Sequence, residues 1–63
     1  SNIAKQFGIA DSTQIAFTIQ GKDGEIAFNF QAKDASISQI VSSINKQNIG
    51  VNAYYDEVWI DFS

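Results

Sequence analysis

Cysteine and histidine are both absent from this chain of 63 residues. Without thiolates or imidazoles it can form neither a disulfide nor the common zinc sites. The same absences exclude Cys-His and Ser-His-Asp nucleophile systems and the usual proton shuttle at neutral pH. The composition therefore argues against most classes of enzyme, and we expect no catalytic residues, no metal site and no cofactor.

Basic residues and long apolar runs are also scarce. Four lysine or arginine residues against seven acidic residues give a formal net charge of -3, the wrong sign for a domain held on phosphates. No apolar run approaches the roughly 18 residues of a membrane span. We therefore expect neither a nucleic-acid partner nor a membrane partner.

Length and apolar content indicate one small domain over residues 1–63. The chain is 44% hydrophobic and 13% aromatic, enough for one core, although a chain this short buries only roughly 60% of its unfolded surface. With no initiator methionine, we expect it to be a segment excised from a larger protein.

Two stretches alternate apolar and polar residues with the period of a strand. They are joined by residues 21–24 (GKDG), whose two glycines suit a tight turn. The pattern predicts a hairpin with one apolar face, formed by Ile15, Phe17, Ile19, Ile26, Phe28 and Phe30. A P-loop would need a helix after its glycines, and here a strand follows.

From Ser36 the apolar period becomes that of a helix, with Ile37, Ile40, Val41 and Ile44 on one stripe. Ser36 and Gln39 have the spacing of a capping box, which accounts for Ser36 better than a Ser-Lys nucleophile does. Asn48 or Gly50 is suited to the left-handed conformation that ends a helix. Alternation returns after residue 50 and predicts two further strands connected by Asp56 and Glu57.

The first 13 residues are predicted to form a short helical turn that ends at Gly8. We expect Ile9 to pack under the sheet and residues 11–12 to turn into the first strand. Together with residues 14–63 as hairpin, helix and hairpin, this predicts an α+β fold of order ββαββ. The expected architecture is a four-stranded, mostly antiparallel sheet with one amphipathic helix on one face.

Two groups of side chains are candidates for function. Asp56, Glu57 and Asp61 form the only acidic cluster. It lacks the length and central glycine of an EF-hand loop, so we interpret it as a solvated hairpin end. Because side chains alternate along a strand, Tyr54 and Trp59 are expected to point away from the helix. There they form either a surface that binds another protein or a cross-strand pair that only stabilises the sheet.

Residues 34–45 (DASISQIVSSIN) and 49–53 (IGVNA) resemble the flagellin IN motif of flagellins and flagellar hook-associated proteins, including the filament cap. Ile44-Asn45 and Gly50-Val51-x-Ala53 match the motif directly. Residues 4–9 resemble the small helix that often precedes it. Asp56-Glu57 departs from the family, which commonly carries glycine in the last turn.

The resemblance implies a structural, non-catalytic module of an exported bacterial flagellar protein, whose partners are other flagellar subunits or further domains of the same chain. The motif residues would be structural: Asn45 folding its amide onto nearby backbone, Gly50 reversing the chain, and Ala53 allowing close helix packing. The alternative is an extracellular protein-binding module of the β-grasp kind. Strand order separates the two, because a β-grasp fold pairs its first and last strands in parallel.

Overall fold

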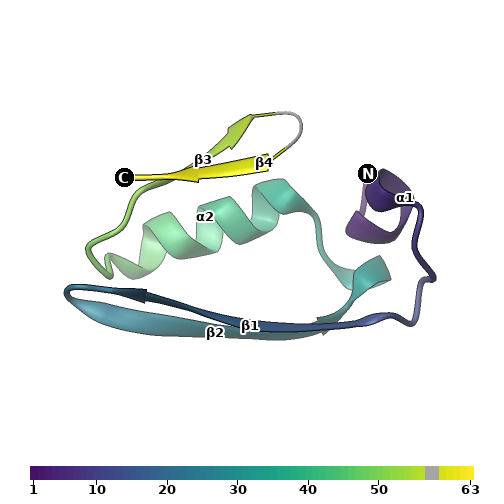
Figure 1. Cartoon of the computed structure of the whole chain (residues 1–63), viewed down its shortest axis with the longest axis horizontal. Coiled ribbons are helices and arrows are strands. Elements are labelled where there is room, and N and C mark those ends of the chain that lie inside the picture. Colours follow the sequence, from purple (N-terminus) through teal and green to yellow (C-terminus); the bar gives the residue numbers. More distant parts are fainter. Residues whose placement is uncertain (57–58) are drawn as a thin grey trace.

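The computed structural model describes the backbone of residues 1–56 and 59–63. The elements in chain order are α1 (Ile3–Phe7), β1 (Gln14–Gly21), β2 (Gly24–Gln31), the 3-10 turn η1 (Ala32–Asp34), α2 (Ile37–Gln47), β3 (Ala53–Asp56) and β4 (Trp59–Phe62). In Figure 1 the β1–β2 hairpin lies below α2 and the β3–β4 hairpin lies above it.

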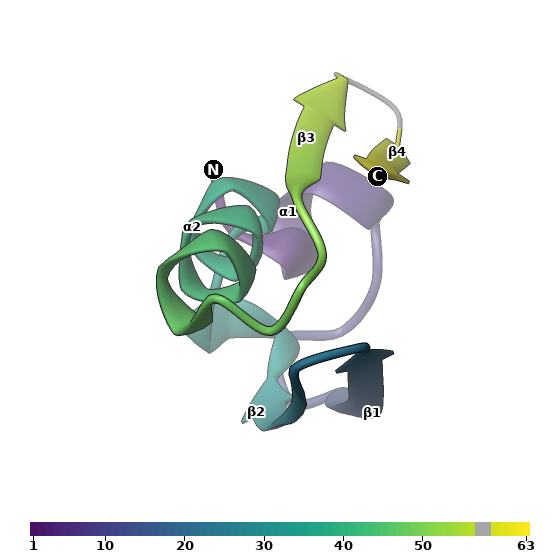
Figure 2. The same ribbon diagram turned by 90° about the vertical axis from the view of Figure 1, so that its left-hand side faces the viewer.

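The expected order of hairpin, helix and hairpin is confirmed, but the single four-stranded sheet is wrong for the described strands. β1 pairs with β2 in one antiparallel sheet and β3 pairs with β4 in another. Figure 2 shows the two hairpins in separate layers. The backbone of Ala53 in β3 bonds to a side chain of α2, so at this residue the edge of β3 faces the helix and not a third strand.

The β1–β2 hairpin follows the predicted pattern closely. Eight consecutive pairs run from Gln14↔Gln31 to Gly21↔Gly24, and burial alternates along β1. Phe17 and Phe28 are cross-strand partners whose rings stack with centroids 4.9 Å apart. Stacked aromatic pairs of this kind add to the stability of a hairpin beyond the area they bury.

α2 begins and ends where the sequence predicts. The Ser36 hydroxyl accepts from the Gln39 backbone N–H at 3.3 Å, while the Gln39 side chain accepts from the Ser36 N–H at 2.8 Å. The helix ends at Asn48, which is left-handed with φ 53°, and Gly50 also has a positive φ of 89°. Asn48 and Gly50, the two residues predicted to end the helix, therefore both contribute to reversing the chain direction after α2.

The core lies between α2 and the two hairpins and includes α1. Ile3, Ala4, Ala32, Ile40, Ile44 and Ala53 form the buried cluster, against which the apolar face of β1–β2 packs. The backbone N–H of Ile3 donates to Ala35 O at 2.9 Å, which ties α1 to the segment before α2.

The predicted helical turn at residues 3–7 is confirmed, and Gly8 ends it with φ 66°. The expectation that Ile9 packs under the sheet is wrong, because its side chain is 38% exposed. The backbone N–H of Ile9 donates to Ala4 O, so the chain folds back at Gly8, and Ile3 and Ala4 take the buried place.

The β3–β4 hairpin is short. Its four pairs run from Ala53↔Phe62 to Asp56↔Trp59. Asn52 and Ser63 extend the ladder with two backbone hydrogen bonds of 2.7 and 2.8 Å. Asp56 belongs to β3 and not to the turn as expected, whereas Glu57, the other predicted turn residue, lies outside the described residues.

Candidate functional site

The Asn45 side chain joins α2 to the start of β3 by two hydrogen bonds. Its Nδ2 donates to the carbonyl oxygen of Ala53 at 2.9 Å, and its Oδ1 accepts from the Ala53 N–H at 2.8 Å. An asparagine amide offers both a donor and an acceptor, so it satisfies both backbone groups of one residue, as a neighbouring strand would. We call this pair of bonds the Asn45 clamp.

Two other positions, Ile44 and Ala53, make the clamp possible. Ile44 is fully buried with 0% exposure and directs this turn of α2 into the core, which leaves Asn45 on the side of the helix that faces β3. Ala53 is only 2% exposed. Its methyl side chain lets the strand backbone approach within hydrogen-bond distance of Asn45.

The loop between α2 and β3 is also held by the tip of the first hairpin. The Asp23 N–H donates to the carbonyl oxygen of Ile49 at 2.9 Å. A Cβ at Gly21 would lie 2.2 Å from that same oxygen, and a Cβ at Gly50 would lie 2.6 Å from Lys22 Cγ. Glycine is therefore required on both sides of this contact, at Gly50 also because of its positive φ.

Most of the predicted structural residues thus come together around the loop between α2 and β3, and the other two lie at the opposite end of the helix. Ser36 and Gln39 cap the start of α2. Ile44, Asn45 and Ala53 meet where the helix contacts β3, and Val51 packs partly buried against the core. The sequence pattern did not reveal the close approach of Gly21 to Ile49, because it joins residues far apart along the chain.

Of the two aromatic candidates, the structure describes the side chain of Tyr54. Tyr54 is 54% exposed and pairs with Asp61. The backbone of Trp59 pairs with Asp56 in β4, but its side chain lies outside the described residues, so the surface formed by both aromatics stays a prediction.

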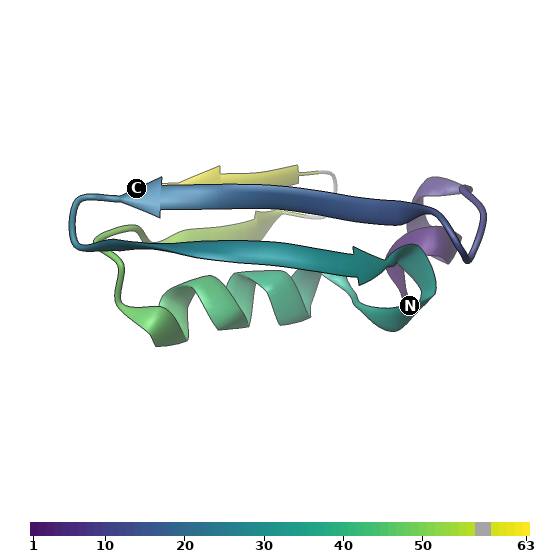
Figure 3. The same ribbon diagram turned by 90° about the horizontal axis from the view of Figure 1, so that it is seen from below.

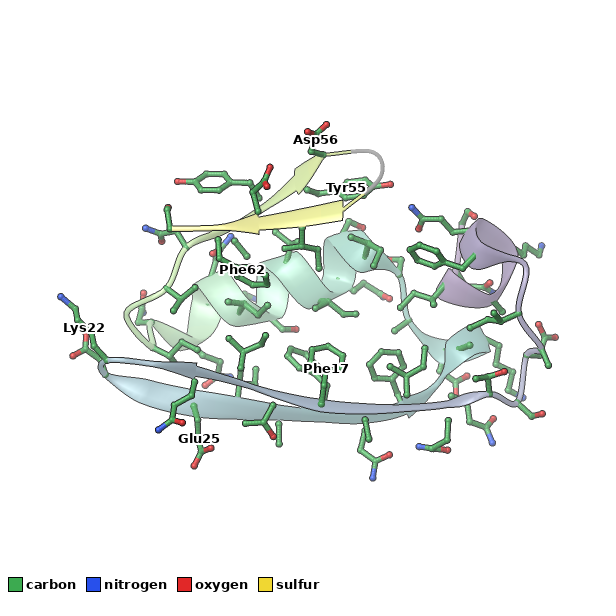
Figure 4. The ribbon with its side chains drawn as sticks, in the orientation of Figure 1. Phe17, Lys22, Glu25, Tyr55, Asp56 and Phe62 are labelled. Carbon is green, nitrogen blue, oxygen red and sulfur yellow. The ribbon has the colours of Figure 1, made fainter. Side chains whose placement is uncertain are left out.

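Tyr55 makes a contact that sequence reasoning missed. Its hydroxyl lies 2.9 Å from Gln6 Nε2, which donates to it and so connects the second hairpin to α1. The two residues also line an open hollow of about 310 Å³ with Ser1, Ser36, Ile37 and Ser38. The alternation that points Tyr54 away from the helix puts Tyr55 on the opposite face of β3 together with Ala53, but nothing in it could identify Gln6 as a partner. Figure 4 labels Tyr55, together with Asp56 and Phe62, on this hairpin.

Within residues 1–56 and 59–63, the structure gives no support for a metal site, a phosphate-binding loop or a membrane span. No group of three or more acidic side chains there is placed to hold a metal ion. Asp56 and Asp61 are exposed, and Glu57 lies outside the described part. The GKDG segment connects two strands, as a hairpin turn does. Neither described helix has the length and hydropathy needed to span a membrane.

These features define a small α+β structural module in which a helix is tied to a hairpin through one side-chain amide. A family model described as the flagellin hook IN motif matches residues 14–61, a range that includes the Asn45 clamp, the first hairpin and all of the second hairpin except Phe62. The chain belongs to this family and is a flagellin-like structural component. A search of curated proteins and a search of solved structures gave no significant match.

Proposed function

We propose that this chain is a non-catalytic structural module on the outer part of an exported bacterial flagellar protein, either a flagellin, a hook-associated protein or a cap protein. The observation that carries the proposal is the family match over residues 14–61. Within it, the Ile-Asn step of the motif has a definite structural task, since Ile44 is buried in the core and Asn45 forms the clamp.

The contacts of the module support a role in holding surfaces in a fixed arrangement. The capping box fixes the start of α2, the Asn45 clamp fixes the second hairpin on the helix, and the bond from Asp23 to Ile49 fixes the tip of the first hairpin. Tyr54 and Phe62 remain about half exposed, at 54% and 48%. A rigid scaffold with exposed aromatic side chains is suited to contact neighbouring subunits or further domains of the same chain.

No observation favours the β-grasp alternative. That fold requires parallel pairing between the first and last strands, whereas β1 pairs with β2 and β4 pairs with β3 in the described sheets. A binding module of another architecture would still differ from the proposed function in where the protein is found on the cell.

Immunogold electron microscopy on source cells, with antibodies raised against this chain, tests the location. We expect label on the flagellum, along the filament for a flagellin or at the tip or hook junction for a cap or hook-associated protein. Cells in which the gene is deleted provide the control. Label over the cell body with bare flagella would contradict the proposal.

A further inference from the structure

β1 has a long, regular edge that no other described strand covers. Its eight residues pair with β2 without a bulge, and among the described strands the sheet contains these two alone. Figure 3 shows β1 toward one margin of the molecule, with β4 behind it, and α2 along the opposite margin, beside β2. An open edge of this kind presents unpaired N–H and C=O groups and is a template for another strand.

This edge lacks the devices that normally prevent pairing. Proteins protect exposed edges with charged residues, proline or bulges, and β1 (QIAFTIQG) contains no charged residue and no proline. The other three strands each carry an acidic residue: Glu25 in β2, Asp56 in β3 and Asp61 in β4. In a chain of net charge -3, pairing of two copies through those strands brings like charges together, whereas pairing through β1 does not.

The sequence of β1 is also nearly the same in both directions. Residues 14–20 (QIAFTIQ) are symmetric about Phe17 except for the exchange of Ala16 and Thr18. If two copies of β1 pair antiparallel about Phe17, Ile15 lies opposite Ile19, and Gln14 lies opposite Gln20. Because alternate residues share a face, the apolar residues stay on the side that faces α2, where Figure 4 shows Phe17, and the polar residues stay on the other side.

We propose that β1 pairs with β1 of a second copy of this chain, antiparallel and centred on Phe17, to form a continuous four-stranded sheet in the order β2-β1-β1-β2. The arrangement is a two-fold, self-complementary interface of the kind common in homo-oligomers. Antiparallel pairing reverses the second copy, so the β3–β4 hairpins of the two copies lie toward opposite ends of the joint sheet.

The interface is small, because it consists mainly of one strand pairing. Stable interfaces bury about 1,200–2,000 Å², so the isolated chain is expected to dimerise weakly and to do so more fully where copies are concentrated. This inference goes beyond the proposed function and does not depend on it, since self-association is measured in solution and not by location on a cell.

Sedimentation equilibrium on the 63-residue chain over increasing concentration provides the first test. We expect the mass to rise from 6.9 kDa toward twice that value. Thr18→Lys is expected to weaken dimerisation by roughly tenfold, because it places two lysines diagonally across the two-fold axis, about 7–8 Å apart. Ala27→Lys is the matched control: Ala27 is the exposed partner of Thr18 on β2, one strand away from the edge. It should dimerise like the unchanged chain.

Single cysteines provide a second test that does not depend on the lysine variants folding. The chain has no cysteine, so an introduced thiol is unique. The proposed register places residue 16 opposite residue 18, and an oxidised mixture of Ala16→Cys and Thr18→Cys chains should form mostly the mixed disulfide. A monomer at every concentration, equal dimerisation of the two lysine variants, or no excess of the mixed disulfide would overturn the proposal.

Discussion

The two hairpins of this module are stabilised in different ways. β1–β2 has eight pairs, a turn bounded by glycines and a stacked Phe17–Phe28 pair. β3–β4 has four pairs, and its first residue is held by a side chain of α2. The first hairpin is therefore specified largely by local sequence, whereas the second depends on a contact with the helix. Variants that break the contacts between elements should expose this difference.

The largest effect is expected from Gly21→Ala, which tests whether the first hairpin is independent of the rest. A Cβ at this position would lie 2.2 Å from the backbone oxygen of Ile49, and backbone cannot move aside as a flexible side chain can. We expect a loss of about 3 kcal/mol in the free energy of unfolding, measured by urea denaturation. A loss below about 1 kcal/mol would mean that the tip of the hairpin moves freely away from the α2–β3 loop.

Asn45→Ala removes the Asn45 clamp and should weaken the second hairpin selectively. The N–H and C=O of buried Ala53 lose their partners, which is expected to cost about 2–3 kcal/mol. Amide hydrogen exchange should become faster at Ala53 and its neighbours in β3, with little change in β1 and β2 beyond the global loss of stability.

Asn52→Ala is the matched control for Asn45→Ala, because Asn52 is an exposed asparagine directly before Ala53. Its replacement should change stability by less than about 0.5 kcal/mol. Equal effects of the two substitutions would show that the clamp contributes nothing particular to the second hairpin.

Gly50→Ala tests the chain reversal that places β3 on the helix. Its φ of 89° disfavours any residue with a Cβ, and that Cβ would also lie 2.6 Å from Lys22 Cγ. We expect thermal unfolding to show a loss of about 1–2 kcal/mol. Gly8→Ala isolates the backbone contribution, since Gly8 has φ 66° and no atom of the described residues lies within 4 Å of its Cβ position. If Gly8→Ala costs as much as Gly50→Ala, the contact with Lys22 is unimportant.

Among the variants that remove a contact, the smallest effect is expected from Tyr55→Phe, which removes only the hydroxyl bonded to Gln6 Nε2. The bond is exposed, so its loss should cost about 0.5–1 kcal/mol. Because Gln6 belongs to α1, exchange protection should fall in residues 3–7 before it falls in β1–β2. Unchanged protection in α1 would show that this bond does not connect the short helix to the second hairpin.

Much of the local structure follows from the sequence. Alternation at residues 15–19 and 26–30 predicted the first hairpin, and the spacing of Ser36 and Gln39 predicted the start of α2. The prediction that Ile9 packs under the sheet was wrong, because the left-handed conformation of Gly8 turns the chain away from the core. Contacts between residues far apart in the chain, such as that of Gln6 with Tyr55, cannot be predicted from the periodicity of apolar residues.

The sequence by itself determined which segments become strands and helices, because hydrophobic period, caps and glycines act over a few neighbouring residues. It also indicated that Asn45 bonds to nearby backbone. Only the tertiary structure decided that the four strands form two sheets and not one. Asn45 bonds to both backbone groups of Ala53, so β3 starts against α2, and the two hairpins pack on different sides of the helix (Figure 1).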